Sequence, residues 1–223
     1  MTSHYISKAQ PARIVRLRLG LSLVVLLCAP LSLMAQPAQN VARDKEEYAV
    51  YSALIRNLYV HFGRRLMVIA SPACCGELAV SRGFSQYAYK DSIPVSQEAF
   101  EDFRAHNPER LALQRMFDLP IPYVIDERAG LVRLVSGPEN DYRLFHAKYP
   151  GAYGFIHLSR VGFNEKLDEA FVFTCEIFDR AFQACRLAVV SKNAGCEACW
   201  FVRLVKKNNN WRVMNIAFHD KPS

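Results

Sequence analysis

The sequence reads Trp200-Phe-Val-Arg-Leu-Val205, then the polar residues Lys207 to Asn210, then Trp211-Arg-Val-Met-Asn-Ile-Ala-Phe218 near its end. Aromatic and β-branched residues of this kind favour strands, and a short polar break between two such runs favours a hairpin turn. Three further stretches of the same character come before them, at residues 156–161, 170–177 and 185–190. Short breaks between successive strands are typical of an antiparallel meander.

Helical patterns dominate the chain before this meander. From Asp44, apolar residues recur at three- and four-residue spacing as far as Tyr59, and Gly63 is expected to end the helix. Further helices are predicted after Ser96, from Asn107 and from Pro138 to Lys148. Strands are predicted at residues 66–70, 123–126 and 131–135, the last two joined across residues 128–130. Helices grouped first and strands grouped last predict an α+β fold, with N-terminal helices packed on a C-terminal antiparallel β-meander.

The first 35 residues have the layout of a secretory signal peptide. Four basic residues form its positive n-region: Lys8, Arg13, Arg16 and Arg18. The apolar run at 19–33 is shorter than the roughly 20 residues of a spanning helix. We therefore predict cleavage after Ala35, with a retained membrane anchor as the alternative. Residues 36–223 show no repeat and no linker rich in Gly, Ser or Pro, so they are predicted to form a single extracytoplasmic domain, periplasmic or secreted.

The net charge of +7 comes largely from that n-region. Without its four basic residues, 24 of the 28 basic residues remain against 21 acidic ones, a net charge of +3. No dense stripe of Lys and Arg with interleaved aromatic residues is left to follow a phosphate backbone. We expect no nucleic-acid partner, and no transmembrane segment once the signal peptide is cleaved.

The C-terminal region also carries a longer pattern. It reads Tyr149-Pro-Gly-Ala-Tyr-Gly-Phe-Ile-His-Leu-Ser-Arg-Val-Gly-Phe-Asn164, then Glu169-Ala-Phe-Val-Phe173, then Arg203-Leu-Val-Lys-Lys-Asn-Asn-Asn-Trp-Arg-Val213. Over about the last 75 residues, this pattern resembles a group of exported bacterial proteins of uncharacterised function. The resemblance implies a secreted α+β domain and no particular activity or ligand. Between Phe173 and Phe201 the chain departs from it, because a longer cysteine-bearing segment replaces the expected glycine-containing hairpin.

Export would place the cysteines in an oxidising compartment, where disulfides form. Six cysteines follow the predicted signal peptide: Cys74, Cys75, Cys175, Cys185, Cys196 and Cys199. We predict that Cys175 pairs with Cys185, because a three-residue turn at 179–181 would place them opposite each other in a hairpin. Cys196 is predicted to pair with Cys199. Adjacent cysteines pair poorly with each other, so Cys74 and Cys75 are left open as free thiols.

The strongest chemical signal is Cys196-Glu-Ala-Cys199. Cysteines at this spacing occur in structural disulfides, in thiol–disulfide oxidoreductases and in zinc sites. A strand is predicted to follow the pair, so the helix dipole that activates such a thiol would be missing. Cys74 and Cys75 lack the spacing of a second zinc-binding pair. A structural disulfide is therefore favoured, and neither a metal nor a cofactor is expected.

Established catalytic motifs are absent from the sequence: it has no His-Glu-x-x-His, Gly-x-Ser-x-Gly, phosphate-binding or dinucleotide fingerprint. No catalytic residue is predicted, and the binding residues stay open. His157 would be capable of acid–base chemistry if folding brought it near Asp126 or Glu127. Arg160 could bind an anion or instead pair with an acidic residue of the protein.

These observations predict an exported soluble domain that is non-catalytic and has a binding or envelope-associated role. The alternative is a periplasmic thiol–disulfide enzyme or a small hydrolytic enzyme. A third hypothesis is a pocket between sheet and helices that holds a small molecule. A pocket lined by convergent polar groups would favour the second or third hypothesis, and a filled core would favour the first.

Overall fold

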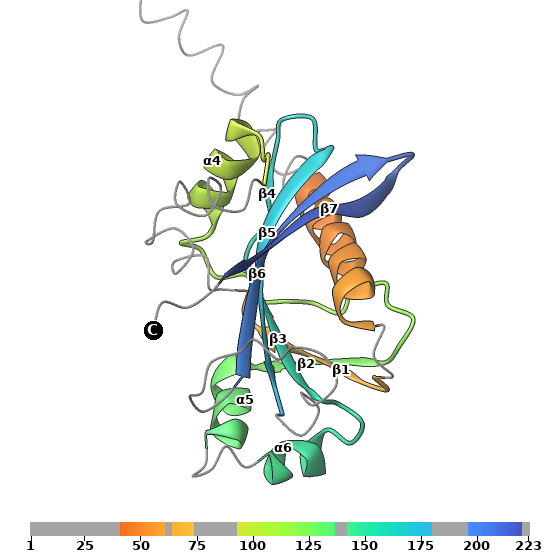
Figure 1. The fold of residues 1–223 in the computed structure, drawn as a ribbon, viewed down its shortest axis with the longest axis vertical. Helices are drawn as coiled ribbons and strands as arrows, with labels where there is room; N and C mark the ends of the chain where they lie inside the picture. The colour runs from red at the N-terminus through yellow and green to blue at the C-terminus, as the bar shows by residue number, and fades with distance from the viewer. Residues whose placement is uncertain (1–40, 61–63, 74–92, 137–141, 180–195, 220–223) are drawn as a thin grey trace, which may run out of the picture. The chain divides into compact units, whose positions relative to one another are not determined.

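A mixed sheet of seven strands organises the described residues from Arg43 onward (Figure 1). The computed structural model describes residues 41–60, 64–73, 93–136, 142–179 and 196–219. The strands are β1 (Met67–Ser71), β2 (Tyr123–Glu127), β3 (Gly154–Leu158), β4 (Gly162–Phe163), β5 (Glu169–Phe178), β6 (Cys196–Lys207) and β7 (Asn210–His219). The described helices are residues 41–58, α4 (Gln97–His106), α5 (Arg128–Val135) and α6 (Arg143–Lys148).

The strand order is β2-β1-β3-β5-β6-β7, and β4 pairs with β5 outside this path. β1 pairs in parallel with both β2 and β3, whereas the strands from β3 onward pair antiparallel. The α+β class and the antiparallel C-terminal strands are confirmed. The predicted meander is only part of the sheet, because β1 and β2, which precede it in the chain and pair in parallel, extend it.

The hairpin between β6 and β7 follows the sequence prediction. Its turn residues Asn208 and Asn209 have φ values of 52° and 61°, in the left-handed region that asparagine tolerates better than most residues. The predicted helix after Ser96 is also confirmed as α4, and the Ser96 hydroxyl accepts the Ala99 N–H at 3.3 Å.

The predicted strand at 131–135 is wrong, because these residues lie in α5. Leu131 and Val135 are four residues apart and both buried, which fits one face of a helix as well as an apolar strand. β2 instead pairs with β1, a strand more than 50 residues earlier in the chain. The local sequence of a short apolar run does not distinguish a strand from one turn or two of a buried helix.

The predicted helix from Asn107 is also wrong, since α4 ends at His106 and no helix follows before α5. Asn107 sits at the C-terminal cap of α4, and its side-chain amide bonds the carbonyl of Phe103 at 2.8 Å and that of Arg160 at 3.2 Å. The helix predicted from Pro138 to Lys148 is confirmed for α6, and residues 137–141 lie outside the described residues. The strand predicted at 185–190 lies outside them as well.

Helices cover both faces of the sheet. The helix of residues 41–58 packs on one face, against side chains that include Ile156 and Val172. α4 packs on the opposite face against Phe171, and α5 and α6 pack there against Phe155. Figure 1 shows the orange helix of residues 41–58 on one side of β5 and β6, with α4 and α5 on the other. Successive side chains of each strand point to opposite faces of the sheet, so they pack in the core on one face or on the other.

Glycine at position 162 is required for the approach of α4 to β4. A Cβ atom at Gly162 would lie 2.2 Å from the Ala99 carbonyl oxygen and 2.4 Å from the Phe103 Cβ. The backbone of α4 would have to move to make room for any larger residue.

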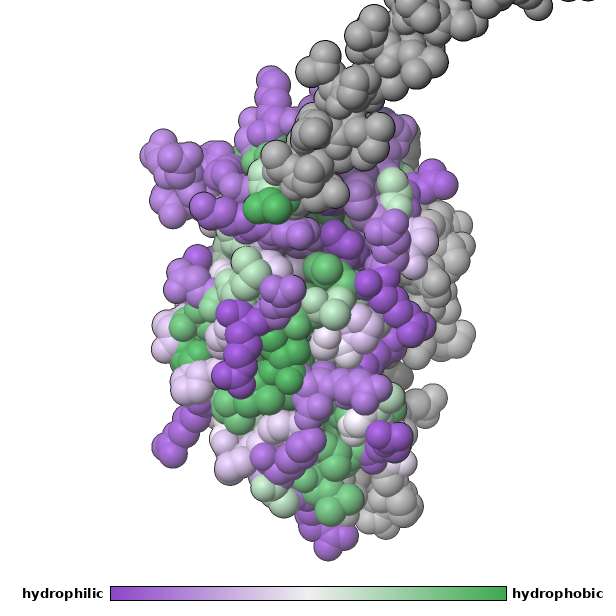
Figure 2. Space-filling view, turned by 180° about the vertical axis from the view of Figure 1, so that it is seen from behind, coloured by the Kyte–Doolittle hydropathy of each residue, from purple (hydrophilic) through white to green (hydrophobic). Residues whose placement is uncertain are grey.

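The surface of the described residues mixes polar and apolar side chains. No helix among these residues is long and apolar enough to span a membrane. The large apolar side chains that are exposed belong to Val41, Met116, Val132, Leu144, Met214 and Ile216. On the face that Figure 2 shows, hydrophobic side chains gather in patches that hydrophilic ones interrupt.

Candidate functional site

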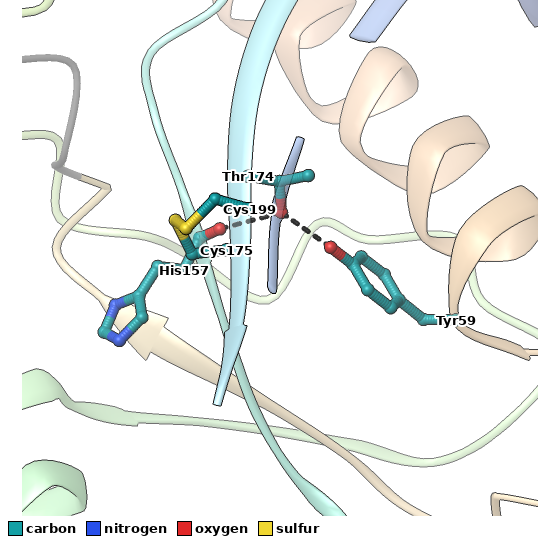
Figure 3. Close-up of a disulfide and its surroundings, with 5 residues drawn as sticks. All are labelled: Tyr59, His157, Thr174, Cys175 and Cys199. Carbon is teal, nitrogen blue, oxygen red and sulfur yellow. Dashed lines mark hydrogen bonds between the residues drawn. A yellow bond between two sulfur atoms is a disulfide. The ribbon is translucent and has the colours of Figure 1, made fainter. Parts of the chain in front are cut away.

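A disulfide joins Cys175 of β5 to Cys199 of β6 (Figure 3). The two residues stand directly opposite each other in the antiparallel pair, with Cα atoms 4.1 Å apart. Both are buried, with exposed fractions of 2% for Cys175 and 8% for Cys199. Two of the predicted disulfide cysteines are therefore confirmed, but the predicted bond between Cys175 and Cys185 is wrong.

The second predicted bond, between Cys196 and Cys199, is also wrong. Both residues belong to β6, where three residues of extended chain span about 10 Å. A disulfide spans Cα atoms no more than about 7 Å apart, so the strand holds this pair too far apart to bond. Cys185 lies outside the described residues. Cys175 pairs with Cys199 and not with Cys185 because β6, and not residues 185–190, lies beside β5.

His157 lies beside this disulfide. It stands opposite Cys175 in the pairing of β3 with β5, and it is only 2% exposed. Neither of its ring nitrogens has a hydrogen-bond partner in the described structure. Burial, helped by the positive charge of Arg128, lowers the pKa of His157 to about 3, so the ring is neutral. Its ring packs edge-on against Phe155, with centroids 5.1 Å apart.

The acid–base pairing considered for His157, with Asp126 or Glu127, is not formed among the described residues. Asp126 instead accepts hydrogen bonds from the Lys148 ammonium at 2.7 Å and from the Tyr149 hydroxyl. These bonds, that of Lys148 first, lower the pKa of Asp126. His157 therefore has no carboxylate to orient it as a general base.

Replacing His157 with leucine is expected to raise the free energy of unfolding by about 1–3 kcal/mol. The substitution removes two buried polar atoms whose hydrogen bonds with water are lost on folding and not replaced. Urea denaturation measures the effect. His106→Leu is the matched control, because His106 is partly exposed and contacts Asp102 at 3.1 Å, so no gain is expected there. A less stable His157→Leu variant would show that the ring is satisfied in solution.

The other face of the same strands carries a separate polar group of residues. Figure 3 shows Tyr59 and Thr174 on the side of β5 opposite the disulfide and His157. The Tyr59 hydroxyl lies 3.0 Å from Thr174 Oγ1, which donates to the His157 carbonyl at 2.9 Å. Arg64 forms a buried ion pair with Glu176, whose pKa is raised by burial despite that partner. Apart from Arg64 Nε, which has no hydrogen-bond partner in the described structure, these groups bond one another, which indicates a structural role.

Arg160 is held by Glu47, a residue that the sequence did not single out. Arg160 Nε lies 2.9 Å and Nη2 3.0 Å from the two Glu47 oxygens. Glu47 Oε1 also accepts the Tyr51 hydroxyl at 2.6 Å and the Val161 N–H at 2.9 Å. Of the two hypotheses for Arg160, the structure supports pairing within the protein. The pair ties the chain between β3 and β4 to the helix of residues 41–58.

A cleft of about 510 Å³ opens at the carboxyl ends of the parallel strands β1 and β2. Its lining residues are Ser71, Pro72, Arg110, Ala112, Ile125, Asp126 and Glu127. Crevices outside the carboxyl ends of parallel strands are common ligand sites in open sheets. The cleft is therefore the best-placed candidate binding site among the described residues.

Two charged side chains in the cleft are available to a ligand. Asp126 is committed to Lys148 and Tyr149, and the Ser71 hydroxyl accepts the Leu113 N–H at 3.1 Å. The side chains of Arg110 and Glu127 are exposed, and neither has an ion pair with another described residue. Arg110 was not predicted from the sequence. Its only local signal is a basic residue in a loop, and the loop reaches the strand ends through the bridge between Ala73 and Leu111.

The remaining described histidines pair within the protein. His106 contacts Asp102, and His146 Nε2 lies 2.9 Å from Asp179 Oδ2. His61 and the side chain of His219 lie outside the described residues. With the disulfide closed, the described residues contain no group of three or more His, Cys, Asp or Glu side chains placed to hold a metal ion.

Comparison with protein-family models, with curated proteins and with solved structures found no match to this chain. The resemblance to exported bacterial proteins stays a prediction.

Proposed function

We propose that this protein is an exported, non-catalytic binding domain that takes a small zwitterionic ligand in the cleft at the ends of β1 and β2. The observation that carries the proposal is the pair of opposite charges at one cleft, on Arg110 and Glu127, neither of which has an ion pair with another described residue. A guanidinium binds a carboxylate through two parallel hydrogen bonds, and a carboxylate binds an ammonium group. A free amino acid or a short peptide carries both groups.

The rest of the cleft supports binding rather than catalysis. Lys148 and Tyr149 hold the carboxylate of Asp126, so its charge is balanced within the protein. The Ser71 hydroxyl is engaged with a backbone N–H, and no described histidine lies in the cleft. The described lining therefore has no hydroxyl or thiol paired with a base, which nucleophilic catalysis requires.

The alternative of a thiol–disulfide enzyme has less support. Enzymatic exchange requires rapid attack of a thiolate on a sulfur atom, and the burial of Cys175 and Cys199 between two strands makes that attack slow. A buried disulfide between neighbouring strands instead stabilises the sheet. A disulfide also supports export, because such bonds persist in oxidising compartments.

Calorimetric titration of the purified protein with free amino acids and with dipeptides such as alanylalanine tests the proposal. For the tightest ligand of the panel, Arg110→Ala and Glu127→Gln are each expected to weaken binding about tenfold or more, because each removes a charged hydrogen bond. Arg115→Ala and Glu109→Gln are matched controls, since both residues are exposed and neither lines the cleft. A panel without any ligand, or an equal loss in the controls, would contradict the proposed cleft.

A further inference from the structure

His157, Cys175 and Cys199 form a row across three neighbouring strands. The register places His157 of β3 opposite Cys175 of β5, and Cys175 opposite Cys199 of β6. Figure 3 shows the imidazole and both sulfur atoms on the same side of β5. All three side chains are buried, and none belongs to the cleft at the ends of β1 and β2.

The closed disulfide leaves His157 without a polar partner. Both ring nitrogens are buried and unbonded in the described structure. Nearly all buried polar side chains have a hydrogen-bond partner, so an exception of this kind calls for an explanation. A leucine or phenylalanine would fill the same position without that penalty. The neutral imidazole that burial favours is also the form that binds metal ions.

Opening the disulfide would supply two further ligands beside this imidazole. Side chains directly opposite each other on antiparallel strands have Cβ atoms about 4.5–5.5 Å apart. A zinc ion binds sulfur at about 2.3 Å and imidazole nitrogen at about 2.0–2.1 Å. Two cysteines on adjacent strands can therefore share an ion, and a histidine on the third strand reaches it through the far edge of its ring.

We propose that reduction of the Cys175–Cys199 disulfide converts this row into a zinc site, with the two cysteine sulfurs and one ring nitrogen of His157 as protein ligands. An external dithiol supplies two electrons and two protons, becomes a disulfide itself, and leaves two thiols on the protein. The ion then displaces the two thiol protons and forms two sulfur–zinc bonds and one nitrogen–zinc bond. Water completes the tetrahedral coordination. The bond between the strands is thus exchanged for a metal bridge.

Cobalt(II) is a spectroscopic stand-in for zinc that tests this site. The full chain is used with Cys28→Ser, Cys74→Ser, Cys75→Ser, Cys185→Ser and Cys196→Ser, so that only Cys175 and Cys199 remain. After reduction with dithiothreitol and its removal without air, cobalt is expected to produce thiolate charge-transfer bands that saturate at one ion per chain. Zinc should abolish these bands, and the oxidised protein should show none. Absence of the bands after reduction, including through loss of the fold, would overturn the proposal.

His157→Leu in the same background tests the role of the imidazole. The substitution is expected to weaken cobalt binding by at least about 10–100-fold. Mutating residues that only hydrogen-bond to metal ligands already weakens metal binding by this factor, and His157 is proposed to be a ligand itself. His106→Leu is the control and should bind as the parent does. Circular dichroism verifies that both variants are folded. Equal cobalt affinity in His157→Leu and the parent would show that His157 is not a ligand.

Discussion

Replacing Glu47 with alanine is expected to lower the free energy of unfolding by about 3–5 kcal/mol. The Glu47 side chain is fully buried, and the substitution would leave the guanidinium of Arg160 without its counter-charge. Removing one partner of a buried ion pair lowers the free energy of unfolding by far more than the intact pair contributes to it, because the remaining charge stays desolvated. The hydrogen bonds from Tyr51 and from the Val161 N–H would be lost as well.

Urea denaturation followed by circular dichroism measures this loss. The matched control is Arg56→Ala, which breaks an exposed pair between Arg56 and Asp118, whose side chains are 44% and 87% exposed. Exposed pairs contribute about 0–1 kcal/mol, so a small change is expected. Similar losses in Glu47→Ala and Arg56→Ala would contradict the structural role assigned to the buried pair.

Removing the disulfide by the double substitution Cys175→Ser and Cys199→Ser is expected to lower the free energy of unfolding by about 2–5 kcal/mol under oxidising conditions. The two cysteines are 24 residues apart, so the bond closes a loop of moderate length in the unfolded chain. Chain-entropy arguments assign about 3–4 kcal/mol to such a loop. Thermal or urea denaturation gives the value.

Peptide mapping without reduction identifies the bond directly. A fragment that links Cys175 to Cys199 is expected from the parent protein and from the control Cys196→Ser, because the strand geometry keeps Cys196 from bonding Cys199. Recovery of a fragment that joins Cys175 to Cys185 would restore the hairpin pairing predicted from the sequence. It would also remove the basis of the proposed zinc site.

Local patterns in the sequence determined much of the secondary structure. Aromatic and β-branched runs predicted β5, β6 and β7, and a polar break at residues 207–210 marked the turn between the last two. Ser96 marked the start of α4. In each case the signal lies within a few residues of the structure it specifies: an N-terminal cap, a polar turn or a strand-favouring composition.

The pairing of these elements was decided only by the tertiary structure. Residues 131–135 form a helix because β2 pairs with β1, far back in the sequence, and not with the residues that follow it. Cys175 bonds Cys199 because β6 holds the place beside β5. A strand has the same side-chain period and composition whichever strand pairs with it. The residues around it in the sequence therefore do not indicate which strand becomes its neighbour in the sheet.

The candidate sites depend on the same long-range pairing. Glu127 ends β2 beside the end of the parallel strand β1, and the bridge between Ala73 and Leu111 brings Arg110 to the same cleft. Glu47 meets Arg160 across 113 positions of the chain. The sequence by itself determined the last three strands, the cap at Ser96, and the cysteine and arginine residues of the disulfide and of the buried ion pair. Burial and strand register decided their partners, because a buried charge or thiol is stabilised by whichever group the fold brings within bonding distance.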